Sequence, residues 1–142
     1  METVKQAAIL IGGKGTRLGD AVRSTPKPLL EVGGRPFVEH VMLNLRRFGF
    51  HDFILLAGYQ SDVVQERYGA GSAFSRELRA NIRVIVEPSP MGTGGALKCA
   101  EPYLQNEFLL LNGDSIFDFN YLDLTNCVHE REPDDWLGRV AL

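Results

Sequence analysis

The sequence predicts an α/β protein with a Rossmann-like, doubly wound and mostly parallel sheet and helices on both faces. Two observations carry this prediction. Four short apolar runs alternate with segments of helical pattern, and three of the runs are almost continuously apolar. Such runs are typical of parallel strands covered on both faces, and strand–helix alternation favours right-handed crossover connections.

The predicted strands are Ala7–Ile11, Phe53–Ala57, Ile82–Val86 and Phe108–Leu111. Helices are expected between them, at Pro36–Phe48, Ser61–Tyr68 and Gly94–Leu104. Ser61 is the type of residue that caps a helix N-terminus, and Pro102 should loosen the last turn of the third helix. The segment Gly69–Ser75 has the weakest pattern, and we expect a surface loop there.

The composition is that of an ordinary globular domain. The chain has 142 residues and a net charge of −3, so no general attraction to nucleic acid or to an anionic membrane is expected. We see neither a signal-peptide pattern nor an apolar run long enough to span a membrane. We therefore expect a cytoplasmic protein, and any anion that it binds must be held by a local site. The oligomeric state stays open, a homo-oligomer included.

Three glycines, Gly12, Gly13 and Gly15, closely follow the first predicted strand. Ligands of open α/β sheets bind beyond the carboxyl ends of the strands, and glycines there let backbone N–H groups approach an anion. Arg17 adds a guanidinium suited to phosphate oxygens. The stretch does not fit a Walker A loop, because Gly13-Lys14 is followed by Gly15 and not by Ser or Thr. It does not fit the dinucleotide fingerprint either, because Leu18 stands where the third glycine belongs. It predicts another kind of phosphate loop, with a turn that binds no ligand as the alternative.

Two further segments carry candidate site residues. Lys27 lies between Pro26 and Pro28, which restrict the backbone, so its ammonium is presented from a stiff segment and can converge with Arg17 on one polyphosphate. Asp114 leaves the fourth predicted strand through a glycine, and Mg²⁺ favours one or two carboxylates plus substrate phosphates. The alternative for Asp114 is a helix or turn cap.

Taken together, these motifs resemble the sugar-1-phosphate nucleotidylyltransferases. The resemblance extends from about Lys5 to Leu124 and is greatest to the guanylyltransferases that act on D-glycero-D-manno-heptose 1-phosphate or mannose 1-phosphate. It rests on four stretches in their order along the chain: Gly12–Leu18, Pro26–Leu29, Glu87–Ala96 and Gly113-Asp114. The resemblance implies that a sugar 1-phosphate attacks the α-phosphorus of a nucleoside triphosphate, which yields an NDP-sugar and pyrophosphate. It also implies that residues 1–142 form the N-terminal, nucleotide-binding portion, without the C-terminal sugar-binding portion.

The resemblance also implies roles for individual residues. Arg17 and Lys27 would be catalytic, since they would stabilise phosphate charge, and Asp114 would hold Mg²⁺. Glu87 stands where the family reads the base, and a carboxylate can accept from both N–H donors of guanine, which favours GTP; the alternative is that it ends a strand and faces water. The implied nucleotide-binding residues are Leu10, Gly12, Gly13, Gly15, Thr16, Glu87, Gly92 and Thr93, and the implied sugar-side residues are Asn112 and Tyr59.

The sequence departs from this family in one respect. The family uses a second metal-binding aspartate and a sugar-phosphate lysine from its later half, and Asp118 does not stand at the position of that aspartate. We therefore expect these 142 residues to bind nucleotide weakly and to turn over poorly or not at all. The alternatives are a non-catalytic nucleotide-binding or regulatory module of the same fold and a nicotinamide-dependent oxidoreductase, which the missing third glycine disfavours.

Overall fold

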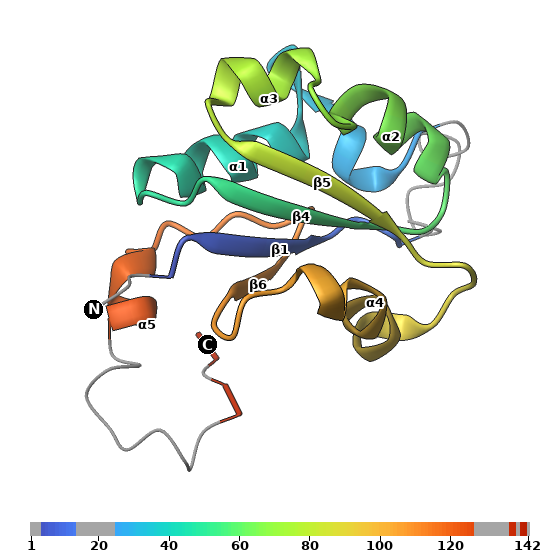
Figure 1. The fold of residues 1–142 in the computed structure, drawn as a ribbon. Coiled ribbons are helices and arrows are strands. Elements are labelled where there is room, and N and C mark those ends of the chain that lie inside the picture. Colours follow the sequence, from blue (N-terminus) through green and yellow to red (C-terminus); the bar gives the residue numbers. More distant parts are fainter. Residues whose placement is uncertain (1–3, 14–24, 127–136, 139, 142) are drawn as a thin grey trace.

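The computed structural model describes residues 4–13, 25–126, 137–138 and 140–141. Its centre is a four-stranded sheet in the order β5–β4–β1–β6 (Figure 1). The strands are β1 (Gln6–Leu10), β4 (Asp52–Ala57), β5 (Asn81–Val86) and β6 (Leu109–Asn112). All three pairings are parallel. The predicted parallel sheet is thus confirmed, and each strand end lies within one residue of the predicted one.

Helices cover both faces of this sheet (Figure 1). On one face lie α1 (Phe37–Arg47), α2 (Ser61–Tyr68) and α3 (Ala73–Leu78), and on the other lies α4 (Gly92–Ala100). Successive strand residues point to opposite faces. Phe53 and Leu55 of β4 accordingly belong to the larger core with α1, α2 and α3, whereas Ile54 packs with Ala96 of α4 in the smaller core. This explains why the runs are continuously apolar, and it confirms the doubly wound arrangement.

The described part of the connection between β1 and α1 contains elements that the sequence pattern did not predict. A 3-10 helix, η2 (Lys27–Leu29), is followed by an antiparallel hairpin of β2 (Glu31–Val32) and β3 (Arg35–Pro36). Leu29 is buried in the larger core, and the N–H of Phe37 donates to the carbonyl of Leu30 at 3.0 Å. The segment that carries Lys27 is therefore anchored to the sheet and to α1.

Three local predictions were wrong. The segment Gly69–Ser75 is not a loop throughout: Ser72 accepts a hydrogen bond from the N–H of Ser75 at 3.2 Å and caps α3. Ser61 is the first residue of α2 rather than its cap, because the chain enters through Gln60 in a left-handed conformation with φ 53°.

The third predicted helix also differs from the prediction. The helix α4 begins at Gly92 and ends at Ala100, and a separate 3-10 helix, η3 (Glu101–Tyr103), contains Pro102. Proline has no N–H to continue the α-helical hydrogen bonds, so it suits the start of the tighter turn. A last helix, α5 (Tyr121–Asn126), packs the ring of Tyr121 against that of Phe48 with centroids 5.4 Å apart.

A buried carboxylate joins several of these elements. Glu39 of α1 accepts hydrogen bonds at Oε1 from Nε of Arg67 and the hydroxyl of Tyr68, each at 2.9 Å. Its Oε2 accepts from Arg35 of β3 at 3.2 Å, and Arg35 also pairs with Glu77 of α3 at 2.9 Å. We call these five residues the Glu39 cluster. It joins β3 and the three helices on this face by charge as well as by apolar packing.

Within the ranges given above, the helices are too short or too polar for any of them to cross a membrane.

Candidate active site

The carboxyl ends of the four strands meet at one edge of the sheet (Figure 1). Leu10, which ends β1, is the register partner of Leu56 in β4 and of Asn112 in β6. Just beyond, the N–H of Gly113 donates to the carbonyl of Leu10 at 2.9 Å, and the N–H of Glu87 donates to that of Ala57 at 3.0 Å. The segments that follow the strands, which hold most of the predicted site residues, therefore start from the same edge.

Lys27 and Asp114 meet although 87 positions separate them in the sequence. Nζ of Lys27 donates to Oδ2 of Asp114 at 2.6 Å, and the two side chains are 41% and 31% exposed. The hydrogen bond from Lys27 lowers the pKa of the Asp114 carboxyl, against the opposing effect of its partial burial. Asp114 is thus ionised near neutral pH and lies beside a cation.

Gly113 sets the position of Asp114. A Cβ atom at Gly113 would lie 2.6 Å from Cγ2 of Ile11 and 3.0 Å from the carbonyl oxygen of Leu10. Real Cβ atoms are essentially never found at the shorter distance, so only glycine lets the chain leave β6 this close to β1.

Glu87 does not simply face water at the end of its strand. Its Oε1 lies so close to two glycines that an added Cβ would be 2.5 Å away at Gly58 and 3.3 Å away at Gly12. Its Oε2 accepts a hydrogen bond from the N–H of Met91 at 3.3 Å. The carboxylate therefore lies across the ends of β1 and β4, next to the first glycine of the predicted phosphate loop.

Gly58 is a site residue that the sequence reasoning missed. It directly follows β4, as Gly12 follows β1 after one residue and Gly113 follows β6. The repeated appearance of glycine at strand ends was the signal that could have identified it. Its function could not be read from the pattern, because the neighbour that needs the space is Glu87, 29 positions away.

Gly92 and Thr93 form the start of α4, beside the Glu87 carboxylate. Gly92 has φ +70°, a left-handed conformation that favours glycine, and the side chain of Thr93 is exposed. Among the sugar-side predictions, Asn112 is exposed at the end of β6, and Tyr59 is half-buried after β4. Each lies at the predicted edge of the sheet, directly after β4 or at the end of β6.

The rest of the predicted phosphate loop is only partly covered by the structure. Leu10 and Gly12 are partly buried and Gly13 is exposed. A Cβ at Gly13 would meet nothing within 4 Å, so packing does not require glycine there. Gly15, Thr16 and Arg17 lie outside the described residues, and their predicted functions remain predictions.

The residues at this edge suit a Mg²⁺ ion that also binds phosphate oxygens. Asp114 supplies carboxylate oxygens at a partly exposed position. In the part of the chain that the structure describes, no group of three His, Cys, Asp or Glu side chains could hold a metal. Mg²⁺ is commonly bound by one or two carboxylates with waters and substrate phosphates. The donor set therefore suits a cation that arrives with phosphate oxygens.

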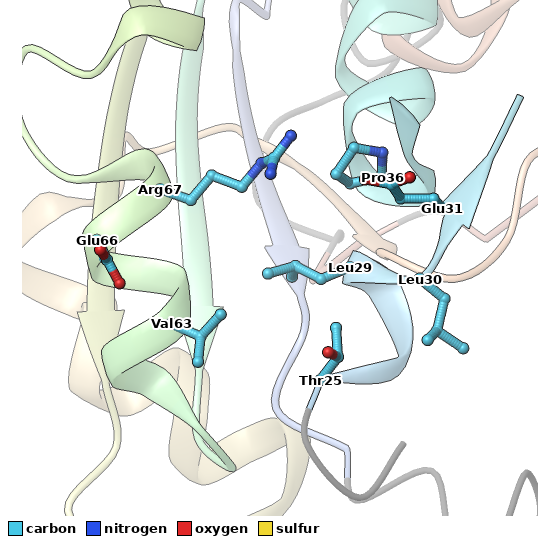
Figure 2. A pocket seen from close by; sticks show the side chains of 8 residues that line it. All are labelled: Thr25, Leu29, Leu30, Glu31, Pro36, Val63, Glu66 and Arg67. Atoms are coloured by element: carbon cyan, nitrogen blue, oxygen red, sulfur yellow. The ribbon is translucent and has the colours of Figure 1, made fainter. Parts of the chain in front are cut away.

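An open cleft of about 610 Å³ lies on the face of the sheet that α1, α2 and α3 cover (Figure 2). It lies between α2 and the segment 25–36, which includes η2, β2 and β3. Figure 2 shows Arg67 and Val63 on one side and Leu29 near the middle. Its lining residues are Thr25, Leu29, Leu30, Glu31, Pro36, Val63, Glu66 and Arg67. None of them is a predicted site residue.

The chain is similar in sequence to several guanylyltransferases. It is 36% identical over 115 residues to the D-glycero-alpha-D-manno-heptose 1-phosphate guanylyltransferase of Campylobacter jejuni, with 81% of this chain and 50% of that protein covered. It is also 36% identical to the mannose-1-phosphate guanyltransferase of Saccharomyces cerevisiae, over 83% of this chain and 33% of that protein. The chain thus spans between a third and a half of the length of these relatives.

Solved structures show the same fold. HddC from Yersinia pseudotuberculosis, solved in complex with GMP-PN, superposes with a TM-score of 0.73 at 29% identity, over 89% of this chain and 55% of HddC. A putative glucose-1-phosphate thymidylyltransferase from Bacillus anthracis gives a TM-score of 0.74 at 26% identity, over 88% of this chain and 50% of that one.

A family profile described as nucleotidyl transferase matches residues 6–138, which is nearly the whole chain. The profile spans all four strands and both Lys27 and Asp114. This assignment leaves no basis for the alternative of a nicotinamide-dependent oxidoreductase. The chain belongs to the nucleotidyl transferase family.

Proposed function

We propose that this chain carries the nucleotide-binding half of a sugar-1-phosphate guanylyltransferase site. The observation that carries the proposal is the convergence of Lys27 and Asp114, 2.6 Å apart, at the edge where open α/β sheets bind ligands. The names of the relatives support it, because they act on heptose 1-phosphate or mannose 1-phosphate. The resemblance to HddC, solved with a guanine nucleotide analogue, supports GTP as the nucleotide.

In the proposed reaction, a phosphate oxygen of the sugar 1-phosphate attacks the α-phosphorus of GTP. The bond from that phosphorus to the bridging oxygen breaks, and the bonding pair leaves with pyrophosphate. Such transfers depend mostly on positioning and on stabilisation of phosphate charge. Lys27 would donate to the phosphate oxygens, backbone N–H groups of Gly12, Gly13, Gly15 and Thr16 would bind the triphosphate, and Arg17 would stabilise the pyrophosphate.

Mg²⁺, held by Asp114 together with phosphate oxygens, would neutralise charge on the triphosphate and orient it. Leu10, Gly92 and Thr93 would line the nucleoside side of the site, and Tyr59 and Asn112 the sugar side.

Glu87 would recognise the base. Guanine presents two adjacent N–H donors, and a carboxylate can accept from both. Each carboxylate oxygen has two lone pairs, so the contact of Oε2 with the N–H of Met91 leaves acceptor capacity. Because Gly12 and Gly58 have no Cβ atom, the Glu87 carboxylate can lie close to their backbone.

The test is a nucleotide panel on the purified chain. Binding of GTP, ATP, UTP and CTP with Mg²⁺ is measured by calorimetry, and pyrophosphate release is measured with mannose 1-phosphate and heptose 1-phosphate. We expect GTP to bind best. Binding or turnover with UTP or CTP that equals or exceeds that with GTP would exclude guanine recognition.

Two variants test the base-reading carboxylate by different means. Glu87→Gln changes its hydrogen-bonding capacity, and Gly58→Ala displaces it without a change of charge, because the new Cβ would lie 2.5 Å from Oε1. We expect each variant to weaken GTP binding about tenfold, which corresponds to roughly 1.4 kcal/mol of binding free energy. ATP binding should weaken less. Glu101→Gln removes an exposed carboxylate paired with Lys98 and serves as the matched control. Equal effects of Glu87→Gln and Glu101→Gln would contradict the assignment.

Transfer is tested separately from binding. If product forms, Lys27→Met and Asp114→Asn should each lower kcat by about 10²–10³, the cost of losing one preorganised electrostatic group. GTP binding without any transfer, in this chain and in a longer one with the relatives' full length, would instead identify the non-catalytic nucleotide-binding module.

A further inference from the structure

The two charged groups of the proposed site bind each other. Nζ of Lys27 donates to Oδ2 of Asp114 at 2.6 Å, which is short even for a charge-assisted hydrogen bond. Oδ1 of Asp114 accepts from the hydroxyl of Ser115 at 3.2 Å. Both carboxylate oxygens therefore already have donors from the protein itself.

The backbone positions both partners of this pair. Lys27 begins η2, where its carbonyl accepts from the N–H of Leu30 at 3.1 Å and Leu29 is buried in the core. Gly113, directly before Asp114, is bonded to Leu10 and packed against Ile11. The contact thus joins two anchored segments, unlike an ion pair between mobile side chains on an exposed helix surface.

A cation that binds at Oδ2 of Asp114 without other ligands must displace the Lys27 ammonium, and one that binds only at Oδ1 lies close to that positive charge. The displaced ammonium then loses its hydrogen bond and stays close to a second positive charge, which is unfavourable. A cation that arrives with a triphosphate brings phosphate oxygens, and these can accept from the ammonium in place of Oδ2. Replacement of Lys27 at Asp114 is therefore much less favourable for a free cation than for a cation bound to a triphosphate.

We propose that Lys27 makes cation binding at Asp114 dependent on the triphosphate, so that the metal and the nucleotide bind together and the metal alone is disfavoured. This inference rests on the proposed function for the identity of the ligands. It assigns to Lys27 control over access to Asp114, in addition to its contact with phosphate.

The experiment measures metal binding without turnover. Mn²⁺ is titrated into isotope-labelled protein, and the paramagnetic broadening of the amide resonances of Gly113 and Ser115 reports occupancy at Asp114. We expect Lys27→Met to bind Mn²⁺ about fivefold more tightly than the unmodified chain, the upper range for loss of a partly exposed ion pair. Lys98→Met removes the lysine of the exposed Lys98–Glu101 pair and should change nothing. Asp114→Asn should abolish the broadening.

A second measurement uses the unmodified chain, in case Lys27→Met perturbs folding. Mg²⁺ alone should leave the carboxyl ¹³C resonance of Asp114 in place at a concentration at which Mg²⁺ with inorganic tripolyphosphate shifts it. An equal shift with and without tripolyphosphate would overturn the inference, as would equal Mn²⁺ affinity of the unmodified chain and Lys27→Met.

The inference and the proposed function fail in different ways. If Lys27→Met binds Mn²⁺ more tightly but the unmodified chain binds no nucleotide, Lys27 controls metal access and the proposed reaction is wrong. If the chain transfers GMP but Lys27→Met gains no metal affinity, the reaction stands and the inference is wrong.

Discussion

Gly113 and Gly58 are the residues on which the geometry of the site most directly depends. Each follows the end of a strand, and a methyl group at either position would come within 2.6 Å of a neighbouring side-chain atom. At Gly58 the neighbour is the end of the Glu87 side chain, which can shift. At Gly113 the neighbours include the carbonyl oxygen of Leu10, at 3.0 Å, which belongs to a central strand and cannot shift easily.

This difference predicts that Gly113→Ala destabilises the fold itself. We expect a loss of about 1–3 kcal/mol in the free energy of unfolding, typical of overpacking in a well-packed region, measured by urea denaturation. Gly138→Ala is the control, because a Cβ there meets nothing within 4 Å and the substitution lowers the entropy of the unfolded chain by a similar amount. If the two variants unfold at the same urea concentration, the close approach of β6 to β1 does not depend on glycine.

At the scale of elements, the Glu39 cluster sets how α1, α2 and α3 lie on the sheet. Glu39 is only 3% exposed, and its carboxylate accepts hydrogen bonds from Arg35, Arg67 and Tyr68. Arg35 belongs to the hairpin directly after η2, so the cluster also supports the segment that presents Lys27. A buried carboxylate with this many donors is costly to disrupt, because its partners would lose their counter-charge.

The cluster predicts a specific alkaline loss of stability. The pKa of the Tyr68 hydroxyl is raised well above its ordinary value. Burial is the largest cause, and the nearby negative charge of Glu39 is the next largest. In the unfolded chain a tyrosine loses its proton near pH 10. The contribution of the protonated Tyr68 hydroxyl to the free energy of unfolding is therefore complete below that pH and is lost as the pH rises further.

We therefore expect Tyr68→Phe to cost about 1 kcal/mol of unfolding free energy at pH 7, the typical value of one hydrogen bond. The difference between the unmodified chain and the variant should shrink above about pH 10, as measured by urea unfolding at a series of pH values. Groups that do not contact Tyr68 titrate equally in both proteins, so the difference reports on Tyr68 and its direct partners. A difference that stays constant to pH 11 would contradict a raised pKa.

At the scale of the whole molecule, the proposed ligand would bridge parts of the chain that are distant in sequence. The loop after β1, the Lys27 segment and the residue after β6 all reach the same edge of the sheet. A ligand that binds them only in the folded state stabilises the entire fold by mass action. The whole fold thus reports nucleotide binding even where no product forms.

We expect GTP with Mg²⁺, at a concentration of about 100 times its Kd, to raise the thermal unfolding midpoint by roughly 8 °C. Differential scanning calorimetry measures the shift. Lys27→Met should reduce it, and Lys98→Met should leave it unchanged, since Lys98 pairs with Glu101 on the exposed side of α4. An equal shift with Mg²⁺ and ATP would argue against recognition of guanine.

Much of this architecture could be predicted from local pattern. Near-continuous apolar runs predicted the strands because both faces of the sheet are covered, and parallel strand ends share one edge. For this reason Asp114, two residues beyond the end of β6, could be placed at that edge, whereas Lys27, 17 residues beyond the end of β1, was assigned to the site by its flanking prolines and by the family resemblance. The helix α3 was missed, because its apolar residues are few and its cap depends on Ser72 bonding three residues ahead.

The sequence by itself determined the four strands of the parallel sheet, the helices α1 and α2 and most of α4, because these follow from periodicity. It also indicated the edge at which a ligand is expected and the types of charged group there, because these follow from the kinds of residue that leave each strand. Only the tertiary structure decided that Lys27 binds Asp114, that Glu87 lies over Gly58 and that Glu39 of α1 binds Arg67 and Tyr68 of α2 and Arg35 of β3. Those facts depend on which atoms lie within a few ångströms of one another across elements far apart in the chain, and no local pattern encodes that distance.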